Sequence, residues 1–238
     1  MIVSQVPQLA ARRLTVGGTR FYQIDGALYP SVTSILQVIA KPDLVRWARR
    51  TTIEAIRQAL DGKGGPYSRE FLEAVLERAA QEPERVRDAA AGKGSSAHEA
   101  VSLALAGEPY DETYAPQVQA ALAFLQDQGL KVLATETVVA SKAHGFAGTA
   151  DLLAERDGAL VLADWKSGSG VWPEYALQLG AYSLAIQEMM GHPIEHAYVV
   201  QLREGGYQAH RVNLEAARPA FLSALALWQG LKAELFQP

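Results

Sequence analysis

An α/β fold is predicted for this chain by two observations on the distribution of its apolar residues. Apolar residues at helical spacing dominate residues 31–129, whereas strand-like runs begin at residue 131 and then alternate with helical segments. Helices followed by alternating strands and helices are typical of an α/β core that carries a helical elaboration. A chain of 238 residues is long enough to bury one sizeable core. We therefore expect a single domain at 1–238, with a mainly helical part at 1–130 and the core at 131–238.

The first half is predicted to begin with a hairpin and to continue as helices. Gly17-Gly18 is a favoured two-residue turn between alternating residues, so a hairpin is expected within residues 14–30. Ser31 begins a short apolar helix. A second helix is expected from Pro42 until the glycines of GKGGP end it, and another at 115–129.

Between these helices, a second glycine-rich stretch is expected to interrupt the chain. Helical segments are predicted at 68–81 and 82–91, with a break at GKGSS and a new helix after it. Ser96 and Glu99 have the spacing of a capping box. This spacing places His98 in the first turn of the new helix.

The second half is predicted to contain five strands and two helices, which together form a central sheet covered by helices. In chain order, the expected elements are strands at 131–140, 148–155 and 159–167, a helix from Pro173 that stops at Gly191, strands at 196–202 and 207–213, and a final helix at 215–235.

The composition is that of an ordinary globular protein, with 49% hydrophobic and 20% charged residues. No apolar run approaches the roughly eighteen residues that a membrane span needs. The N-terminal stretch MIVSQVPQLAARRL lacks the basic and apolar regions of a secretory signal, so a cytoplasmic location is expected.

The absence of cysteine restricts the chemistry that the chain can perform. Without cysteine there can be no disulfide, thiol nucleophile, iron–sulfur cluster or cysteine zinc site. A metal would have to be held by carboxylates, histidines and backbone oxygens, which favours Mg²⁺ or Mn²⁺. The net charge of −4 argues against a protein that coats nucleic acid non-specifically, although a local basic groove is compatible with it.

Two aspartates near the Asp157-Gly158 turn are predicted to face each other across a hairpin. Pairing outward from this favoured turn places Asp151 opposite Asp164, with Cβ atoms about 5 Å apart. Two carboxylates at that spacing repel, unless a cation lies between them or one of them is protonated. Lys166 shares the strand face of Asp164, where a lysine can act on a water or stabilise charge on a phosphate.

These residues leave two interpretations open. D-x-K is a very common triplet, so the segment can be a solvated strand end with an incidental Asp–Lys pair. Paired carboxylates, a divalent metal and an adjacent lysine also suit phosphodiester hydrolysis.

The helix after the D-x-K strand carries a further polar pair. Gln178 and Tyr182 are four residues apart and therefore lie on one helix face, close to an apolar stripe. A buried amide needs hydrogen-bond partners. Such a pair is compatible with a site and equally with a glutamine bonded to backbone beside a core tyrosine.

The types of these residues and their order along the chain resemble the motifs of the PD-(D/E)XK nuclease superfamily, in its RecB-like branch. That branch has a histidine in a helical segment, an aspartate, D-x-K and Q-x-x-x-Y, and here GSSAHEA, GTADLLA, LADWKSG and QLGAY follow in that order. YPSVTSIL and DWKSG are similar to the part of the branch that contains the mitochondrial genome maintenance exonuclease and phage and bacterial relatives. The resemblance extends from Tyr29 to the final helix. It implies a restriction-endonuclease-like fold with a mixed central sheet flanked by helices.

The resemblance also implies roles for individual residues. Asp151, Asp164 and Lys166 would be the catalytic residues, and both aspartates would bind metal. His98 would be a further metal ligand, and the carbonyl of Trp165 another.

Further positions match the branch less closely or depart from it. Gln178 and Tyr182 would position the lysine region or the nucleic acid. Glu136, on the preceding strand, matches an acidic position often found near the metals. The branch often has an acidic residue one turn after the histidine, whereas this chain has Ser102, so the ligands for a second metal are incomplete.

The function expected from the resemblance is that of a metal-dependent DNA exonuclease. It would use Mg²⁺ or Mn²⁺ to hydrolyse phosphodiester bonds at free or single-stranded DNA ends, in DNA repair, recombination or phage DNA processing. One alternative is a non-catalytic nucleic-acid-binding module that kept the nuclease fold; a degenerate site would normally have lost Asp151, Asp164 or Lys166. The other is a structural or partner-binding protein whose carboxylates form a buried pair.

Overall fold

The fold is described by a computed structural model that covers residues 6–168 and 170–232, so the end of the expected final helix at 233–235 lies outside the described residues. The chain divides into two compact units: Met1–Ile39 together with Ser96–Pro238, and Ala40–Ser95. Among the described residues, none of the helices combines the length and the apolar character required to cross a membrane.

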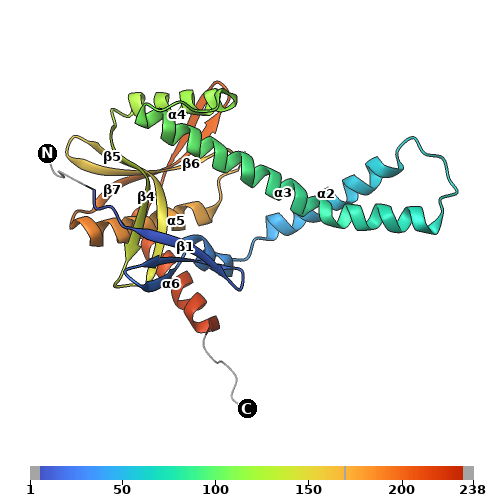
Figure 1. The fold of residues 1–238 in the computed structure, drawn as a ribbon, viewed down its shortest axis with the longest axis horizontal. Helices are drawn as coiled ribbons and strands as arrows, with labels where there is room; N and C mark the ends of the chain where they lie inside the picture. Colours follow the sequence, from blue (N-terminus) through green and yellow to red (C-terminus); the bar gives the residue numbers. More distant parts are fainter. Residues whose placement is uncertain (1–5, 169, 233–238) are drawn as a thin grey trace, which may run out of the picture. The chain divides into compact units, whose positions relative to one another are not determined.

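The larger unit is built on a mixed five-stranded sheet (Figure 1). Its strand order is β4-β5-β6-β7-β8, with β6 and β7 parallel and the other neighbours antiparallel. This sheet confirms the predicted α/β fold with a mixed central sheet. The strands are β4 (Lys131–Ser141), β5 (Phe146–Arg156), β6 (Ala159–Lys166), β7 (Ile194–Arg203) and β8 (Gly206–Arg211).

Helices cover both faces of this sheet because the central strands are apolar on both sides. Leu160 and Leu162 of β6 pack in one core, with helices α5 (Pro173–Met190) and α6 (Leu214–Lys232). Val161 and Trp165, which point the other way, pack in a second core with α4 (Ala115–Asp127) and the last turns of α3. Strands buried on both faces read as continuous apolar runs, which explains the sequence of β6.

The predicted turn at Asp157-Gly158 fixes the register between β5 and β6. Both residues have positive φ, 51° and 85°, as a tight hairpin turn requires. The pairing Leu152↔Ala163 and Glu155↔Leu160 is the one predicted. Its next step outward places Asp151 and Asp164 opposite each other.

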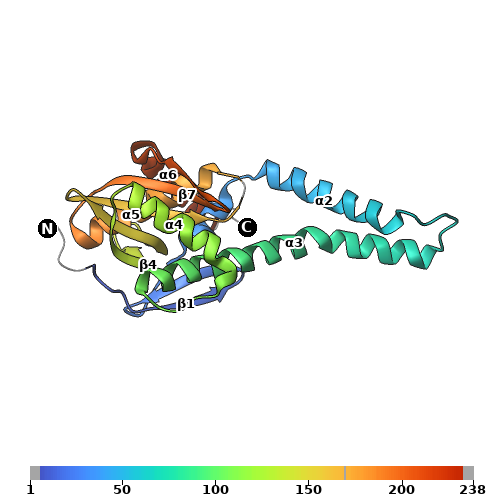
Figure 2. The same cartoon turned by 90° about the horizontal axis from the view of Figure 1, so that it is seen from above.

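A small N-terminal sheet packs beside the main one (Figures 1 and 2). The predicted hairpin is confirmed as β1 (Ala11–Val16) and β2 (Thr19–Ile24), and a second turn at Asp25 adds β3 (Ala27–Pro30). Tyr22 and Ile24 form a small core with Ala140 and Ala147 of the main sheet. The chain then enters α1 (Val32–Ile35), capped by Ser31 as predicted, and a 3₁₀ turn (Leu36–Val38).

The expected break at GKGSS is wrong. Helix α2 (Pro42–Leu60) is followed by one long helix, α3 (Arg69–Ala106), which continues through Pro83 and the glycines of GKGSS. His98 therefore lies well inside a helix, and the expected capping box does not exist. Each interior glycine costs about 1 kcal/mol relative to alanine, but ending the helix would require a second nucleation. Burial of Ala97 and Val101 just beyond the glycines stabilises the continuous helix.

Candidate metal centre and active site

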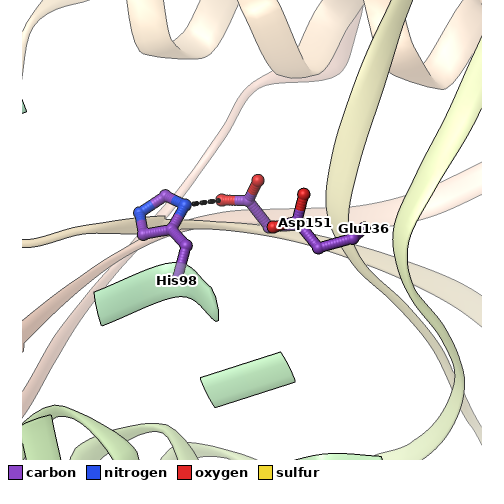
Figure 3. A group of neighbouring side chains, drawn as sticks. All are labelled: His98, Glu136 and Asp151. Carbon is purple, nitrogen blue, oxygen red and sulfur yellow. Dashed lines mark ion pairs between the residues drawn. The ribbon is translucent and has the colours of Figure 1, made fainter. Parts of the chain in front are cut away.

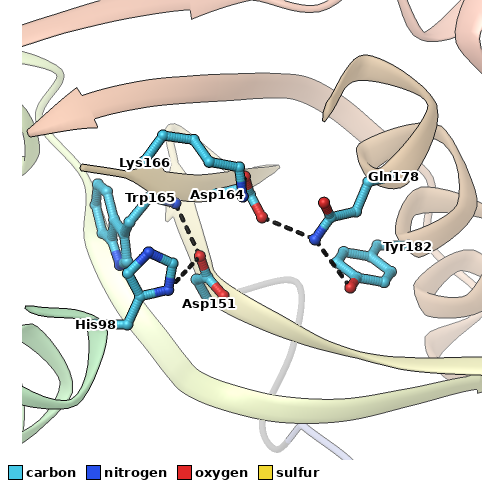
Figure 4. A network of polar contacts seen from close by, with 7 residues as sticks. All are labelled: His98, Asp151, Asp164, Trp165, Lys166, Gln178 and Tyr182. Carbon is cyan, nitrogen blue, oxygen red and sulfur yellow. Dashed lines mark hydrogen bonds and ion pairs between the residues drawn. The ribbon is translucent and has the colours of Figure 1, made fainter. Parts of the chain in front are cut away.

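Asp151, in the middle of β5, is the centre of a polar network that includes the last residues of β6 (Figure 4). Its Oδ2 accepts a hydrogen bond from the Trp165 backbone N–H at 2.8 Å and lies 3.2 Å from Nδ1 of His98. The hydrogen bond from Trp165 follows from the strand register, because Trp165 comes directly after the residue opposite Asp151. The contact with His98 follows from the continuous helix α3, which carries His98 to the sheet.

The charges of Asp151 and His98 stabilise each other. Burial alone would raise the pKa of Asp151, but the charges of His98 and Lys166 and the hydrogen bonds from His98 and Trp165 hold that pKa below its usual value. Burial disfavours the His98 cation, yet the Asp151 carboxylate raises the pKa of His98 above 6.5. Protonated His98 is thus the favoured partner of Asp151 when no other cation is present.

Glu136 joins these two residues in a group suited to metal binding (Figure 3). One ligand atom each from His98, Glu136 and Asp151 lies within 4.8 Å of the others. Glu136 lies within β4 between Thr135 and Thr137, with a left-handed φ of 47°, and the register of its neighbours places it across from Asp151. A non-glycine residue in this region stores about 1–3 kcal/mol of strain, which is typical of functional positions.

This donor set fits a hard divalent cation. Two carboxylates and one imidazole suit Mg²⁺ or Mn²⁺, and a chain without cysteine offers no thiolate ligand. The pKa of Glu136 is raised by desolvation and by the neighbouring Asp151 charge, so the two carboxylates repel when no cation lies between them. A bound cation would relieve this repulsion.

We expect replacement of His98 by alanine to weaken Mn²⁺ binding by at least about tenfold, because even residues behind a metal ligand contribute this much. In the wild-type protein, Mn²⁺ affinity should increase as the pH rises through the raised pKa of His98, since the ligand must lose its proton. Calorimetric titration at several pH values measures both effects. The control is His192→Ala in an exposed loop. Equal Mn²⁺ affinities for the two variants would show that His98 is not a metal ligand.

Asp164 is the most deeply buried charged group of the network, with 1% of its surface exposed. Its Oδ1 accepts a hydrogen bond from Gln178 Nε2 at 3.0 Å, and its Oδ2 forms an ion pair with Lys166. Among the described residues, Oδ2 has no other hydrogen-bond partner. Burial raises the pKa of Asp164 to about 6, and the Asp151 charge adds to this effect while Lys166 opposes it. The repulsion expected between the two aspartates therefore acts mainly on Asp164.

Lys166 is held by charge on one side and by an aromatic ring on the other. Its Nζ lies 4.7 Å from the centroid of the Tyr175 ring, a cation–π geometry. Burial would lower the pKa of Lys166, but the charges of Asp164 and Asp151 outweigh it and raise that pKa. Lys166 is therefore an ammonium ion, with 17% of its side chain exposed.

Gln178 and Tyr182 are linked to the carboxylates as their shared helix face predicts. Gln178 Nε2 donates to Asp164 and also to the Tyr182 hydroxyl, at 3.0 Å each. The contact of Gln178 is with the aspartate rather than with the lysine. Tyr182 is buried against Gly148 of β5, where an added Cβ would lie 2.4 Å from Cε1 of the ring.

We expect Gly148→Ala to destabilise the protein by about 1–3 kcal/mol, the usual cost of overpacking. The methyl group would displace the Tyr182 ring, and with it the hydrogen bond that Gln178 makes to Asp164. Urea unfolding measures the change. Gly168→Ala is a matched control, because an added Cβ meets nothing within 4 Å there; equal unfolding midpoints for the two variants would contradict the close contact at Gly148.

The structure brings seven of the eight site residues expected from the sequence together through their side chains. Trp165 differs, because its ring is buried in the second core and only its backbone N–H reaches Asp151. The role of its carbonyl as a metal ligand stays a prediction. Ser102, one turn after His98, forms a hydrogen bond with Thr135 at 2.9 Å and not with a carboxylate.

Sequence reasoning missed Gln201, which anchors the loop after Lys166. Its Nε2 donates to the carbonyl of Gly168 at 2.8 Å. His210 of β8 contacts the same side chain. The only signal in the sequence was a glutamine directly after the apolar residues Val199 and Val200.

Comparison with known proteins places this geometry in context. The model of the PD-(D/E)XK nuclease superfamily matches residues 39–236. No curated protein matches the chain. Among solved structures, the alkaline exonuclease LHK-Exo from Laribacter hongkongensis is 16% identical over 85% of this chain and 90% of its own, with a TM-score of 0.35. LHK-Exo in complex with dAMP is 18% identical over 78% and 94%, with a TM-score of 0.34.

Proposed function

Because the chain belongs to the PD-(D/E)XK nuclease superfamily, we propose that it is a metal-dependent deoxyribonuclease whose active centre is formed by Asp151, Asp164 and Lys166. The observation that carries this proposal is the convergence of these charged groups, with His98, in one largely buried network. Buried charges are costly unless they are paired, and such clusters are concentrated at functional sites.

Superfamily members generally use divalent metals, and the residues present fit such an ion. We propose that His98, Asp151 and Asp164 hold Mg²⁺ or Mn²⁺, with the Trp165 carbonyl and Glu136 as further ligands. Such an ion would supply Lewis-acid polarisation of a phosphoryl oxygen.

Lys166 would stabilise the negative charge that develops on the phosphate. As an ammonium ion, it has three N–H donors, and one of them can form a hydrogen bond to a non-bridging phosphate oxygen. Its raised pKa favours this role over removal of a proton from water. Gln178 and Tyr182 would act indirectly, because they fix Asp164 and so the position of Lys166.

The proposed substrate is DNA with free or single-stranded ends, processed in DNA repair, recombination or phage DNA processing. Support for an exonuclease comes from the resemblance of the four ordered motifs to the RecB-like branch. The same centre in a protein that binds DNA without cutting it is the competing function.

The test is cleavage of end-labelled single- and double-stranded linear DNA, with circular DNA of the same sequence as control. We expect linear DNA to be degraded from its ends in Mn²⁺ or Mg²⁺, and no degradation in chelator. Cleavage of circular DNA at a rate similar to that of linear DNA would show that the protein is an endonuclease and not an exonuclease. Binding without cleavage in either metal would favour the non-catalytic module.

A further inference from the structure

Polar side chains cross one face of the main sheet from β4 to β8, and their charge changes sign along the way. The carboxylates lie on β4, β5 and β6, in the order Glu136, Asp151, Asp164. Lys166 pairs with Gln201 of β7, and His210 of β8 pairs with Val199, two residues before Gln201. Residues two apart on a strand share a face, so Gln201 and His210 continue the row of polar side chains onto β7 and β8.

Gln201 joins the basic end of this row to the loop after Lys166. The side chain is 1% exposed and uses both ends of its amide. Nε2 donates to the Gly168 carbonyl, while Oε1 accepts from Arg203 Nη2 at 2.8 Å and lies 3.3 Å from His210 Nε2. A buried amide bonded in this way has one orientation, so Gln201 fixes the loop, Arg203 and His210 with respect to one another.

Arg203 is well placed to bind an anion. It is exposed at the end of β7, and within the part of the chain that the structure describes no carboxylate forms an ion pair with it. Its guanidinium has five N–H donors, of which the Gln201 contact uses one. Neighbouring strands are about 4.8 Å apart. Arg203 lies on the strand next to Lys166, two residues beyond its register partner Gln201, and His210 lies one strand further. A phosphate bound there is therefore a neighbour of the phosphate at the carboxylates.

We propose that Arg203 and His210 form a second phosphate-binding subsite, which holds the nucleic-acid backbone beside the scissile phosphate, and that Gln201 is the positioning residue that aligns this subsite with Lys166. This subsite rests on the proposed nuclease function. It contacts a phosphate and no base, so it contributes affinity and register without sequence preference.

The test compares Arg203→Ala with Arg211→Ala in DNA cleavage at several salt concentrations. Arg211 is an exposed arginine of β8 that pairs with Tyr198 and contacts His196, on the opposite face of the sheet. Each phosphate contact with single-stranded DNA contributes about 0.7 to the slope of log affinity against log salt, or about fivefold in affinity at 0.1 M salt. We expect Arg203→Ala to raise KM about fivefold at 0.1 M salt and to lower this slope by about 0.7, with kcat nearly unchanged. Arg211→Ala should match the wild type.

Two further variants keep the outcome decisive. His210→Ala should raise KM in the same direction, and Arg203→Lys should recover most of the salt slope because it keeps the charge. An unchanged KM and salt slope in both Arg203→Ala and His210→Ala, in a wild-type background that cleaves DNA, would overturn the subsite and leave the nuclease intact. Absence of cleavage by the wild-type protein in Mn²⁺ and Mg²⁺ would instead overturn the proposed function, and the subsite with it.

Discussion

Lys166→Ala is expected to reduce DNA cleavage by about 10²–10⁴-fold, the usual contribution of a group that acts on charge or protons in the transition state. The reason is specific to its position, because the ammonium is held between Asp164 and the Tyr175 ring beside the carboxylates. The rate constant for release of labelled nucleotides under single-turnover conditions measures the loss, since substrate binding then does not limit the rate.

Lys142→Ala provides the matched control for this experiment. Lys142 is an exposed lysine whose only ion pair within the described part of the chain is with Asp25. The control should cleave at the wild-type rate, and circular dichroism should show both variants folded. Cleavage by a folded Lys166→Ala protein within about threefold of the wild-type rate, far above the usual loss, would exclude Lys166 as a catalytic residue.

Asp164→Asn is expected to abolish cleavage and yet to stabilise the metal-free protein at neutral pH. The pKa of Asp164 is raised from 3.8 to about 6, so its neutral form is favoured in the folded state. The stability associated with this proton is fully present below about pH 4 and is lost as the pH rises through about 6. A shift of about two units corresponds to roughly 3 kcal/mol, or about 5–10 °C in melting temperature for a chain of this length.

Thermal melts in chelator at pH 4.5 and pH 7.5 test this expectation, because the advantage of Asp164→Asn over the wild type should appear mainly at the higher pH. Asp151→Asn is the comparison of equal size. Asp151 has a lowered pKa and accepts hydrogen bonds, so its replacement should destabilise the protein. Loss of stability in Asp164→Asn, equal at both pH values, would show that the buried carboxylate is a stabilising group.

The sequence predicted those parts of the fold that depend on local chemistry. The Asp157-Gly158 turn determined the pairing of β5 with β6, and α5 ends at Gly191 as expected, where the structure shows a left-handed conformation. The long helix α3 was not predictable in this way, because glycine and proline only bias a helix toward ending. Whether it continues depends on what its later turns bury, and that is a property of the folded chain.

The same distinction between local patterns and the packing of the folded chain applies to the candidate site. Asp151 opposite Asp164 followed from counting along a hairpin, and Gln178 beside Tyr182 from helical spacing. The contact of Gln201 with Gly168 joins residues 33 positions apart through side-chain packing, and no local pattern encodes it. The sequence gives Asp151 and Asp164 the same charge. Only the folded structure shows that burial, together with the Asp151 charge, raises the pKa of Asp164, and that the His98 charge helps to lower the pKa of Asp151.

The close contact between Gly148 and Tyr182 limits which amino-acid substitutions this chain can accept during evolution. A side chain at position 148 requires a smaller residue at position 182, while a smaller residue at 182 alone leaves a void beneath the sheet. Substitutions at the two positions are therefore expected to be non-additive, because each changes the cost of the other. Because Tyr182 also reaches Asp164 through Gln178, epistasis between a glycine and a tyrosine of the core extends to the carboxylates, and it restricts the mutational routes that preserve them.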